Sequence, residues 1–332
     1  MSATPLRAAI IVGLTIAMAG CAAIAQPKAF MHAPLGLPSP ALGIWNEPSQ
    51  LSGLSFVRFP KATGPFVYGC GFHVCVWYAK GHNKLVGEIS GFSDAQGVGV
   101  SPVNGDIFVA DDGRSDIKEY APDSTMLVHR YLDPGQFPVD AAVDRAGNVF
   151  VANSVDQNSG PGSVTVYDSS GTILRTLHDP NAFVGRSVAV DEHDLLVFCY
   201  NTRSGEGECD EFPHGRGPGV PTAHGIGFAG GTAFDAAEHF VVIDEVNAVA
   251  DTFAGSTLCG SYALADSNVP VMIAFDRSSR VLYNANTAVR GIAAYPYSDC
   301  GSGTLRPTIV YDDGLGQHMS MTGAAVTPSA GP

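Results

Sequence analysis

Short runs of alternating apolar and polar residues, each ended by turn residues, make up most of this chain. Between Val139 and Leu177 four such runs follow one another: DAAVD, VFVAN, VTVYD and ILRTL. An Arg-Ala-Gly-Asn turn, a polar loop and a Ser-Ser-Gly turn separate them. Alternation with a period of two, broken by turns, predicts antiparallel strands that pair with their sequence neighbours. One such unit cannot bury both of its faces alone, so further copies are expected.

The copies are present along the chain. The second run recurs at intervals of 41 to 48 residues, ending at Cys70, Asp111, Asn153, Asn201, Asp244 and Asn286. The first run recurs at intervals of 41 to 52 residues, ending at Pro102, Asp144, Asp191, Asp235, Asp276 and Pro328. A four-stranded repeat of about 40 to 50 residues is typical of a β-propeller blade. The pattern therefore predicts an all-β fold, a six-bladed β-propeller.

The two series of strands are offset, and the offset predicts how the ring closes. The earliest second strand, Phe66–Cys70, has no first strand just before it. The last first strand, Thr322–Pro328, has no second strand after it. We expect the C-terminal strand to become the innermost strand of the N-terminal blade, which removes an otherwise open edge.

The N-terminus has the features of an export signal. Ala8–Ala19 is an apolar run of signal-peptide length behind a single charge, Arg7, and is too short to span a bilayer. Met-Ala-Gly-Cys follows at once, so residues 1–20 are interpreted as a lipoprotein signal peptide and Cys21 as the lipidated residue. An ordinary secretory signal cut near Ala25 is the alternative. Residues 21–60 are expected to form a Pro/Ala-rich tether, and residues 61–332 the propeller.

The composition limits the classes of binding partner that can be expected. The 332 residues carry a formal net charge of −14, with no cluster of Lys or Arg. Nucleic acids and anionic lipid surfaces attract clustered basic groups, so neither is expected as a partner. We expect an exported monomer facing the periplasm or the cell exterior, held at a membrane only through its N-terminal lipid.

Six cysteines remain after Cys21, and an even number in an exported protein predicts disulfides. Cys70 and Cys75 flank a short loop between second and third strands, and Cys199 and Cys209 bracket the equivalent connection. Each pair would lie across a hairpin. Cys259 and Cys300 would then join two neighbouring blades, although six cysteines allow 15 pairings and the sequence does not decide among them.

Acidic and amide side chains end the second strands. The loops from second to third strands, and from outer strands to the next inner strand, share one end of a propeller, called here the connection face. The candidate ligand residues there are Asp111, Asp112, Asn153, Asn201, Asp244, Glu245 and Asn286. Such oxygens suit Ca²⁺ or another divalent cation. Asp and Asn also end strands because they tolerate turn geometry and bond to their own backbone. No catalytic residue is assigned, and His214 and His224 lie in an irregular Gly/Pro loop.

The phrases VSPVNGDIFVADDGRSDIKEY and VDRAGNVFVANS…GSVTVYDSSGTIL resemble the NHL-repeat and SMP-30 (gluconolactonase-like) group of six-bladed propellers. The likeness is clear over Gly97 to Leu177. In the SMP-30-like lactonases an acidic residue, two Asn and an Asp hold a divalent metal, and Asn153, Asn201 and Asp244 match by blade position. Cys70 stands where the acidic ligand is sought, and the flanking motifs are absent.

Two functions follow from these observations. In the first, a lipid-anchored extracytoplasmic propeller acts as a binding or scaffold module for a protein, peptide or glycan. In the second, the resemblance implies a metal-dependent hydrolase or lyase of the lactonase type. The missing catalytic constellation favours the first.

Overall fold

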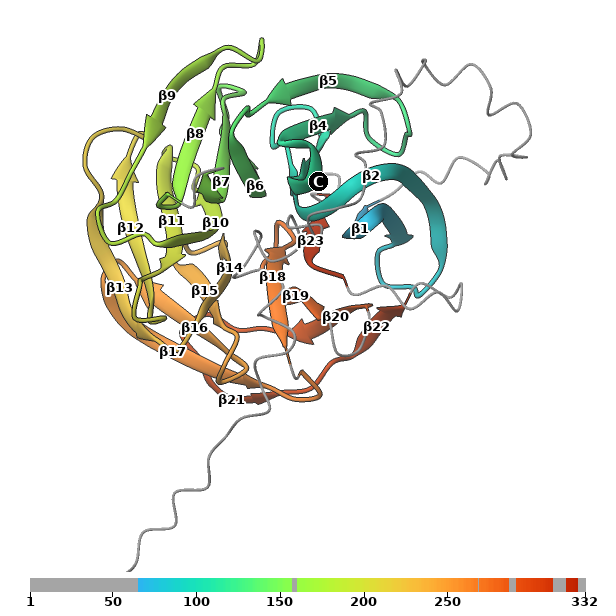
Figure 1. Ribbon diagram of the computed structural model, residues 1–332. Coiled ribbons are helices and arrows are strands. Elements are labelled where there is room, and N and C mark those ends of the chain that lie inside the picture. Colours follow the sequence, from blue (N-terminus) through green and yellow to red (C-terminus); the bar gives the residue numbers. More distant parts are fainter. Residues whose placement is uncertain (1–64, 157–159, 268, 287–290, 313–320, 328–332) are drawn as a thin grey trace, which may run out of the picture. The chain divides into compact units, whose positions relative to one another are not determined.

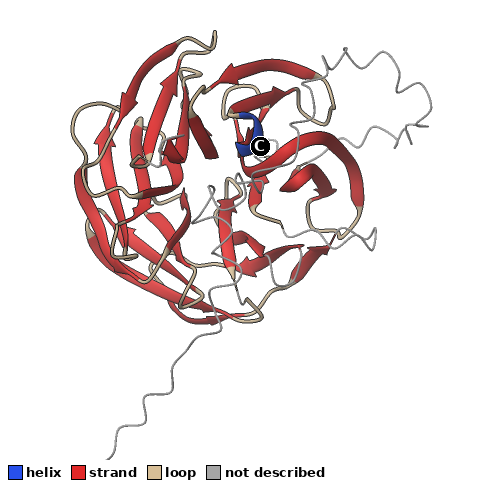
Figure 2. Cartoon of the chain, in the orientation of Figure 1, coloured by secondary structure: helices blue, strands red, loops and turns tan. Residues whose placement is uncertain are grey.

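The computed structural model describes residues 65–156, 160–267, 269–286, 291–312 and 321–327, which all belong to one compact unit, 58–332. In these ranges the chain is built from strands and turns, with one short 3₁₀ turn, η2 (Asp112–Arg114) (Figure 2). No helix among the described residues is long and apolar enough to cross a bilayer. The predicted signal peptide, Cys21 and the tether lie outside the described residues.

The strands form five hydrogen-bonded sheets. The first has the order β23-β1-β2-β3-β4-β5, with β1 (Phe66–Ala79), β2 (Leu85–Val100), β3 (Ile107–Asp111), β4 (Asp116–Tyr120), β5 (Leu127–Leu132) and β23 (Gly323–Val326). The second is β6 (Gln136–Val143), β7 (Val149–Asp156), β8 (Ser163–Tyr167) and β9 (Ile173–Leu177). The third is β10 (Val184–Val190), β11 (Leu195–Asn201), β12 (Gly207–Pro213) and β13 (Val220–Ile226).

The last two sheets exchange one strand: β21 follows β20 in the chain but joins the preceding sheet. The fourth sheet has β14 (Ala229–Phe234), β15 (Phe240–Asp244), β16 (Val249–Ala254), β17 (Thr257–Leu264) and, at its outer edge, β21 (Ser302–Leu305). The fifth has β18 (Pro270–Phe275), β19 (Val281–Asn286), β20 (Gly291–Pro296) and β22 (Ile309–Asp312). β21 pairs in parallel with β17, so a segment between β20 and β22 extends the preceding sheet.

The propeller class is confirmed, but the sheets number five and not the predicted six. The first sheet contains the segments that were expected to form two blades. Its strand β2 is continuous: Leu85 to Ser90 pair with the second half of β1, whereas Ala95 to Val100 pair with β3. The chain therefore passes from the edge of one repeat to the inner strand of the next without a break in hydrogen bonding. The sequence showed the two repeats but not this continuity.

Six strands nevertheless surround the axis (Figure 1). Contacts run from β2 to β6, β10, β14, β18 and β23, and from β23 back to β2, so the circle of inner strands is complete. Small residues allow the close approach, because a Cβ on Gly231 would lie 2.5 Å from the Met272 backbone and one on Gly323 would strike the Gln96 carbonyl. Small residues in the inner strands thus allow these strands to crowd around a narrow axis.

The C-terminal strand closes this circle as predicted. β23 pairs antiparallel with the start of β1, with Val67 opposite Val326 and Cys70 opposite Gly323. Two threonines hold its ends. The Phe66 amide donates to Thr327 Oγ1 at 2.6 Å, and the Thr322 amide donates to the Cys70 carbonyl at 2.8 Å.

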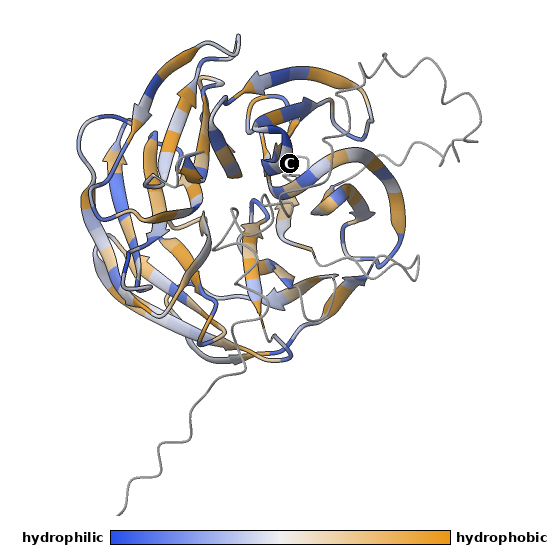
Figure 3. Ribbon diagram, in the orientation of Figure 1, coloured by the Kyte–Doolittle hydropathy of each residue, from blue (hydrophilic) through white to orange (hydrophobic). Residues whose placement is uncertain are grey.

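The core lies between neighbouring sheets. All five residues of β3, β8 and β15 are buried, because both faces of a middle strand pack on adjacent sheets. Phe150 and Val164 of the second sheet pack with Phe198 and Tyr200 of the third in one cluster. The outer strands β5 and β9 have mostly exposed residues, and apolar and polar positions alternate along the strands (Figure 3). Truncating such an aromatic residue costs about 3 to 5 kcal/mol.

The outer part of the third sheet is more regular than expected. The Gly/Pro/His stretch was expected to form a weak fourth strand at best. β13 instead pairs with β12 over residues 220–226, with two register shifts that accommodate the glycines. His214 and His224 are both exposed there.

Candidate functional site

The predicted ligand residues lie at or near the ends of the second strands, with Asn153 three residues before the end of β7, but they point into the protein. Five of them are at most 3% exposed: Asp111, Asn153, Asn201, Asp244 and Asn286. A strand-ending residue on a solvated turn would be open to water. Deep burial requires instead that each polar atom find a partner within the protein.

Three of these side chains accept hydrogen bonds from backbone amides close to the start of an inner strand segment. Asp111 accepts hydrogen bonds from the amides of Ser93 and Asp94 at 2.8 to 3.1 Å. Asn201 accepts from the Ala229 amide at 2.9 Å, reaching the inner strand of the next sheet. Asp244 accepts from the Gly227 amide at 2.6 Å and from the amides that follow it in its own turn. These contacts join segments 17 to 28 residues apart.

The two remaining amides contact residues of the connection between sheets. Asn153 donates to Thr165 Oγ1 at 3.0 Å, and Thr165 donates in turn to Asp133 at 3.2 Å. Asn286 donates to Ser267 Oγ at 2.8 Å. All five side chains thus help to hold the segments that lead from an outer strand to the next inner strand.

Asp112 and Glu245 follow the strand ends and differ from the other five. Burial, together with the neighbouring Asp94 and Asp111 carboxylates, raises the pKa of Asp112 to about 7. Glu245 forms a buried ion pair with Arg186, whose Nε also donates to the Ala229 carbonyl at 3.0 Å. Lys118 forms the corresponding ion pair with Asp111.

The four carboxylates among the seven residues belong to no cluster of metal-ligand side chains. In the described part of the chain, three groups of His, Cys, Asp or Glu place their ligand atoms within 4.8 Å of one another, and none includes Asp111, Asp112, Asp244 or Glu245. Asp111, Asn201 and Asp244 accept hydrogen bonds from backbone amides, and Glu245 pairs with Arg186. Asn153 Oδ1 and Asp112 Oδ1 are buried without a hydrogen-bond partner among the described residues.

A hollow lies at the other end of the axis, where first strands turn into second strands. This end, called here the turn face, contains the turns 101–106, 144–148, 191–194, 235–239 and 276–279. A cavity of about 800 Å³ opens among them. It continues into an axial cavity of about 260 Å³, lined by residues of all six inner strands. The two share Val100, Pro102, Phe234, Phe275 and Val326.

The lining of this cavity is apolar with charged groups at its rim. Phe234, Phe275 and several prolines supply the apolar surface. Arg145 pairs with Glu192 at 2.5 Å across two neighbouring turns, and Asp276 pairs with Lys80. Among the described lining residues there is no His, Cys, Lys or Tyr. The sequence analysis missed this cavity, because its residues are the turn formers DRAGN, DEHD, DAAE and DRSS.

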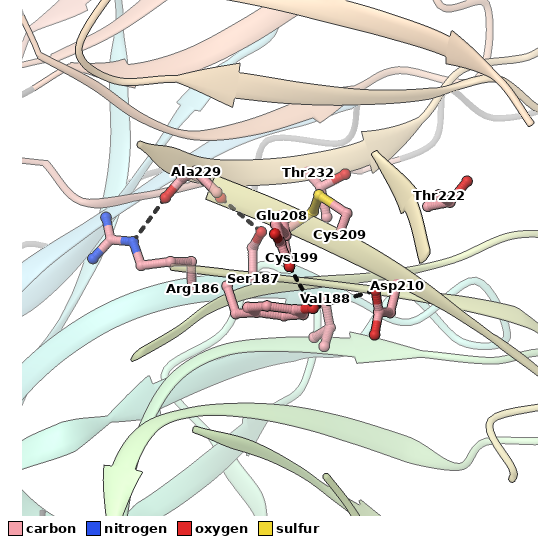
Figure 4. The surroundings of a disulfide bond; sticks show 12 residues. Arg186, Ser187, Val188, Cys199, Glu208, Cys209, Asp210, Thr222, Ala229 and Thr232 are labelled. Carbon is pink, nitrogen blue, oxygen red and sulfur yellow. Dashed lines mark hydrogen bonds between the residues drawn. A yellow bond between two sulfur atoms is a disulfide. The ribbon is translucent and has the colours of Figure 1, made fainter. Parts of the chain in front are cut away.

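The three disulfides have the expected pairing: Cys70–Cys75, Cys199–Cys209 and Cys259–Cys300. Cys199 and Cys209 lie opposite each other on β11 and β12. Figure 4 shows this bond beside β10, from which Arg186 extends to the Ala229 carbonyl. The bond joins β11 and β12 two residues before the connection that begins after Asn201.

Comparison with known proteins supports the fold. No protein-family profile and no curated protein sequence matches the chain. A chain of a nidogen/laminin complex superposes with a TM-score of 0.67 at 14% identity, covering 80% of this chain and 98% of that one. A protein of unknown function from Bacteroides caccae gives 0.59 at 12%, covering 80% and 99%. Hydrazine synthase of Kuenenia stuttgartiensis gives 0.52 at 14%, covering 68% and 70%. At these identities the likeness shows the propeller fold alone.

Proposed function

We propose that this protein is a lipid-anchored extracytoplasmic binding module that holds a protein or peptide segment at the cavity of the turn face. The cavity itself carries the proposal: it combines a large apolar lining with a charged rim at the mouth of a rigid ring. Ligand pockets are concave and mostly apolar, with a few polar groups that fix orientation. The similarity to a chain of a nidogen/laminin complex, a protein–protein assembly, is consistent with this proposal.

The charges at the rim are committed to the protein's own structure. Asp235 accepts from the amides of Ala237 and His239 and from the Tyr297 hydroxyl. Asp276 is occupied by Lys80 and the Ser278 hydroxyl. Carboxylates held by hydrogen bonds and an ion pair are poorly placed to abstract protons. Their fixed positions suit the orientation of a bound chain, which favours binding over catalysis.

A pair of tryptophan substitutions tests the location. Ala236 is exposed and lines the cavity, whereas Val246 is 71% exposed in a loop of the connection face. Peptides selected from a displayed random library against the full-length protein should bind Ala236→Trp at least about tenfold more weakly, a loss of about 1.4 kcal/mol. They should bind Val246→Trp as tightly as wild type in calorimetric titrations.

Opposite results would overturn the proposal. Peptides that lose affinity only for Val246→Trp would move the ligand site to the connection face. A glycan that binds the cavity where no peptide does would change the ligand class. Stoichiometric Ca²⁺ or a transition metal in the native protein would favour the lactonase-type alternative.

The anchor belongs to the same proposal. The three disulfides suit an oxidising compartment outside the cytoplasm. Wild-type protein should partition into the detergent phase, while Cys21→Ser should remain an uncleaved or soluble form. Equal partitioning of the two would exclude the lipid anchor and leave the ordinary secretory signal.

A further inference from the structure

A cluster of metal-ligand side chains lies where the outer strands β17 and β21 meet the turn between β14 and β15. It consists of His239, at the end of the β14–β15 turn, Cys259 on β17 and Cys300 in the turn before β21. Asp299 and Asp235 lie beside the histidine. The two sulfurs are joined as a disulfide, so the cluster combines a redox-active pair with an imidazole and a carboxylate.

Three of the four ligand atoms lie close enough together for one metal ion once the sulfurs are separated, and the fourth, from Asp299, lies beside His239. His239 Nδ1 lies 3.7 Å from Cys300 Sγ and 2.6 Å from Asp299 Oδ1. The ligand atoms of His239, Cys259 and Cys300 all lie within 4.8 Å of one another. Two thiolates, an imidazole and a carboxylate are a tetrahedral ligand set typical of Zn²⁺.

The scaffold that holds these residues does not depend on the disulfide. β21 pairs with β17 from Ser261 opposite Ser302 to Leu264 opposite Leu305. The Ser261 amide donates to the Gly301 carbonyl at 3.0 Å, and Tyr262 holds Ser298 through its hydroxyl at 2.6 Å. Breaking the S–S bond would therefore leave both thiols close together.

The histidine is fixed as firmly as the cysteines. Its backbone amide donates to Asp235 Oδ1 at 3.0 Å, which closes the turn that presents the ring. The side chain is 23% exposed, so a metal ion has access from solvent.

This disulfide is also the most open of the three. Cys259 and Cys300 are partly exposed, whereas the four other bonded cysteines are at most 2% exposed. A reductant in solution therefore reaches Cys259–Cys300 first.

We propose that reduction of Cys259–Cys300 converts this cluster into a Zn²⁺ site with His239 and Asp299 as the remaining ligands. A dithiol reductant supplies two electrons and two protons, which break the S–S bond and leave two thiols while the reductant becomes a cyclic disulfide. Metal binding then releases both thiol protons to solvent. The cluster becomes a redox-gated metal site that is closed in the oxidised protein.

Cobalt substitution tests the site in the full-length protein. After limited dithiol treatment and anaerobic removal of the reductant, a thiol titration should find two free thiols in a protein whose circular dichroism is unchanged. One equivalent of Co²⁺ should then give thiolate-to-cobalt charge-transfer bands and tetrahedral d–d bands, which Zn²⁺ abolishes. Oxidised protein should show neither set.

Variants locate the ligands. Cys259→Ser/Cys300→Ser keeps the β17–β21 pairing and should lose both sets of bands. Removing even a partner of a ligand costs roughly 10- to 100-fold in metal affinity, so His239→Gln should weaken Zn²⁺ competition by at least that factor. Glu238→Gln, on the exposed neighbouring residue, is the matched control and should leave affinity unchanged.

Several results would overturn the proposal. A disulfide that resists reduction until the protein unfolds would show that the site does not open. Thiols that bind Co²⁺ equally well in His239→Gln would remove the histidine from the site. Reduced wild type without thiolate bands would leave only an ordinary structural disulfide.

Discussion

The two ends of the ring use the same residue type in different ways. On the turn face an aspartate at the end of a first strand closes its own turn: Asp191 accepts from the amides of His193 and Leu195, both at 2.8 Å. On the connection face an aspartate at the end of a second strand binds a distant loop, as Asp244 binds Gly227. We call the first kind of contact a local clamp and the second kind a distant clamp. Local clamps leave the axis open, and a cavity remains. Distant clamps occupy the side chains that would otherwise contact a ligand.

Strand β23 touches both ends, so its removal should have the largest effect. Deleting Ser320–Pro332 takes away the threonine contacts at Phe66 and at Cys70 together with the inner strand between them. The exposed edges of β1 and β2 should make the protein insoluble or lower its melting temperature markedly in calorimetry. A truncated protein that melts like the full chain would contradict closure by this strand.

Replacing the two aspartates measures the difference between the faces. Asp244→Ala should lower the free energy of unfolding by about 3 kcal/mol, because it leaves buried amide donors without an acceptor. Asp191→Ala removes two hydrogen bonds from a solvated turn, where water replaces the carboxylate, and should cost less than about 1 kcal/mol. Urea unfolding of both variants decides the matter. Equal losses would mean that the two clamps are equivalent.

The sequence predicted the local clamps and the strand order but not the distant clamps. Turn chemistry is readable from DRAGN or DEHD because all the bonded atoms lie within five residues. The partner of Asn201 is Ala229, 28 residues away, and its position depends on the register of two strands. The same residues therefore appeared to be cation ligands. The cavity escaped notice for the same reason, since turns far apart in the sequence form it.

The sequence did not decide among the 15 pairings, but the two hairpin pairs could be expected because their geometry is that of the repeat. Cys199 and Cys209 stand at mirrored positions of one hairpin, and the alternation places both on the same side. The continuity of β2 had no comparable signal, because Ser90 to Ala95 resemble a loop in composition.

The Cys199–Cys209 bond should contribute less than the Asp244 clamp. It closes a short loop of the connection face, so the loss of unfolded-state entropy on bridging is modest. Replacing both cysteines with alanine should cost about 2 to 3 kcal/mol in urea unfolding, with the fold retained. The bond lies two residues from Asn201, whose side chain accepts a hydrogen bond from the Ala229 amide. The variant should therefore also speed hydrogen exchange of the Ala229 amide. If exchange became faster elsewhere but not at the Ala229 amide, the disulfide would not support the contact between Asn201 and Ala229.

The smallest expected effect concerns pH at the axis. Asp140 lines the axial cavity and accepts from the Val188 amide at 3.1 Å, yet burial raises its pKa from 3.8 to about 7. The folded protein thus keeps a proton that the unfolded chain has lost, so the contribution of Asp140 to stability falls as pH rises from about 4 to 7. Asp140→Asn should melt a few degrees higher than wild type at pH 8 and equally at pH 4.5. A pH-independent difference would reject this assignment.

Closure by the last strand also sets the order in which the ring can form. Phe66 and Thr327 are 261 residues apart, so β1 is synthesised long before the strand that completes it. Until then the first and last repeats each have an unpaired inner edge, and the contact that joins them has the highest sequence separation in the described chain. Because long loops close at an entropic cost and such contacts slow folding, ring closure should be the final and slowest step. Every earlier intermediate is an open arc.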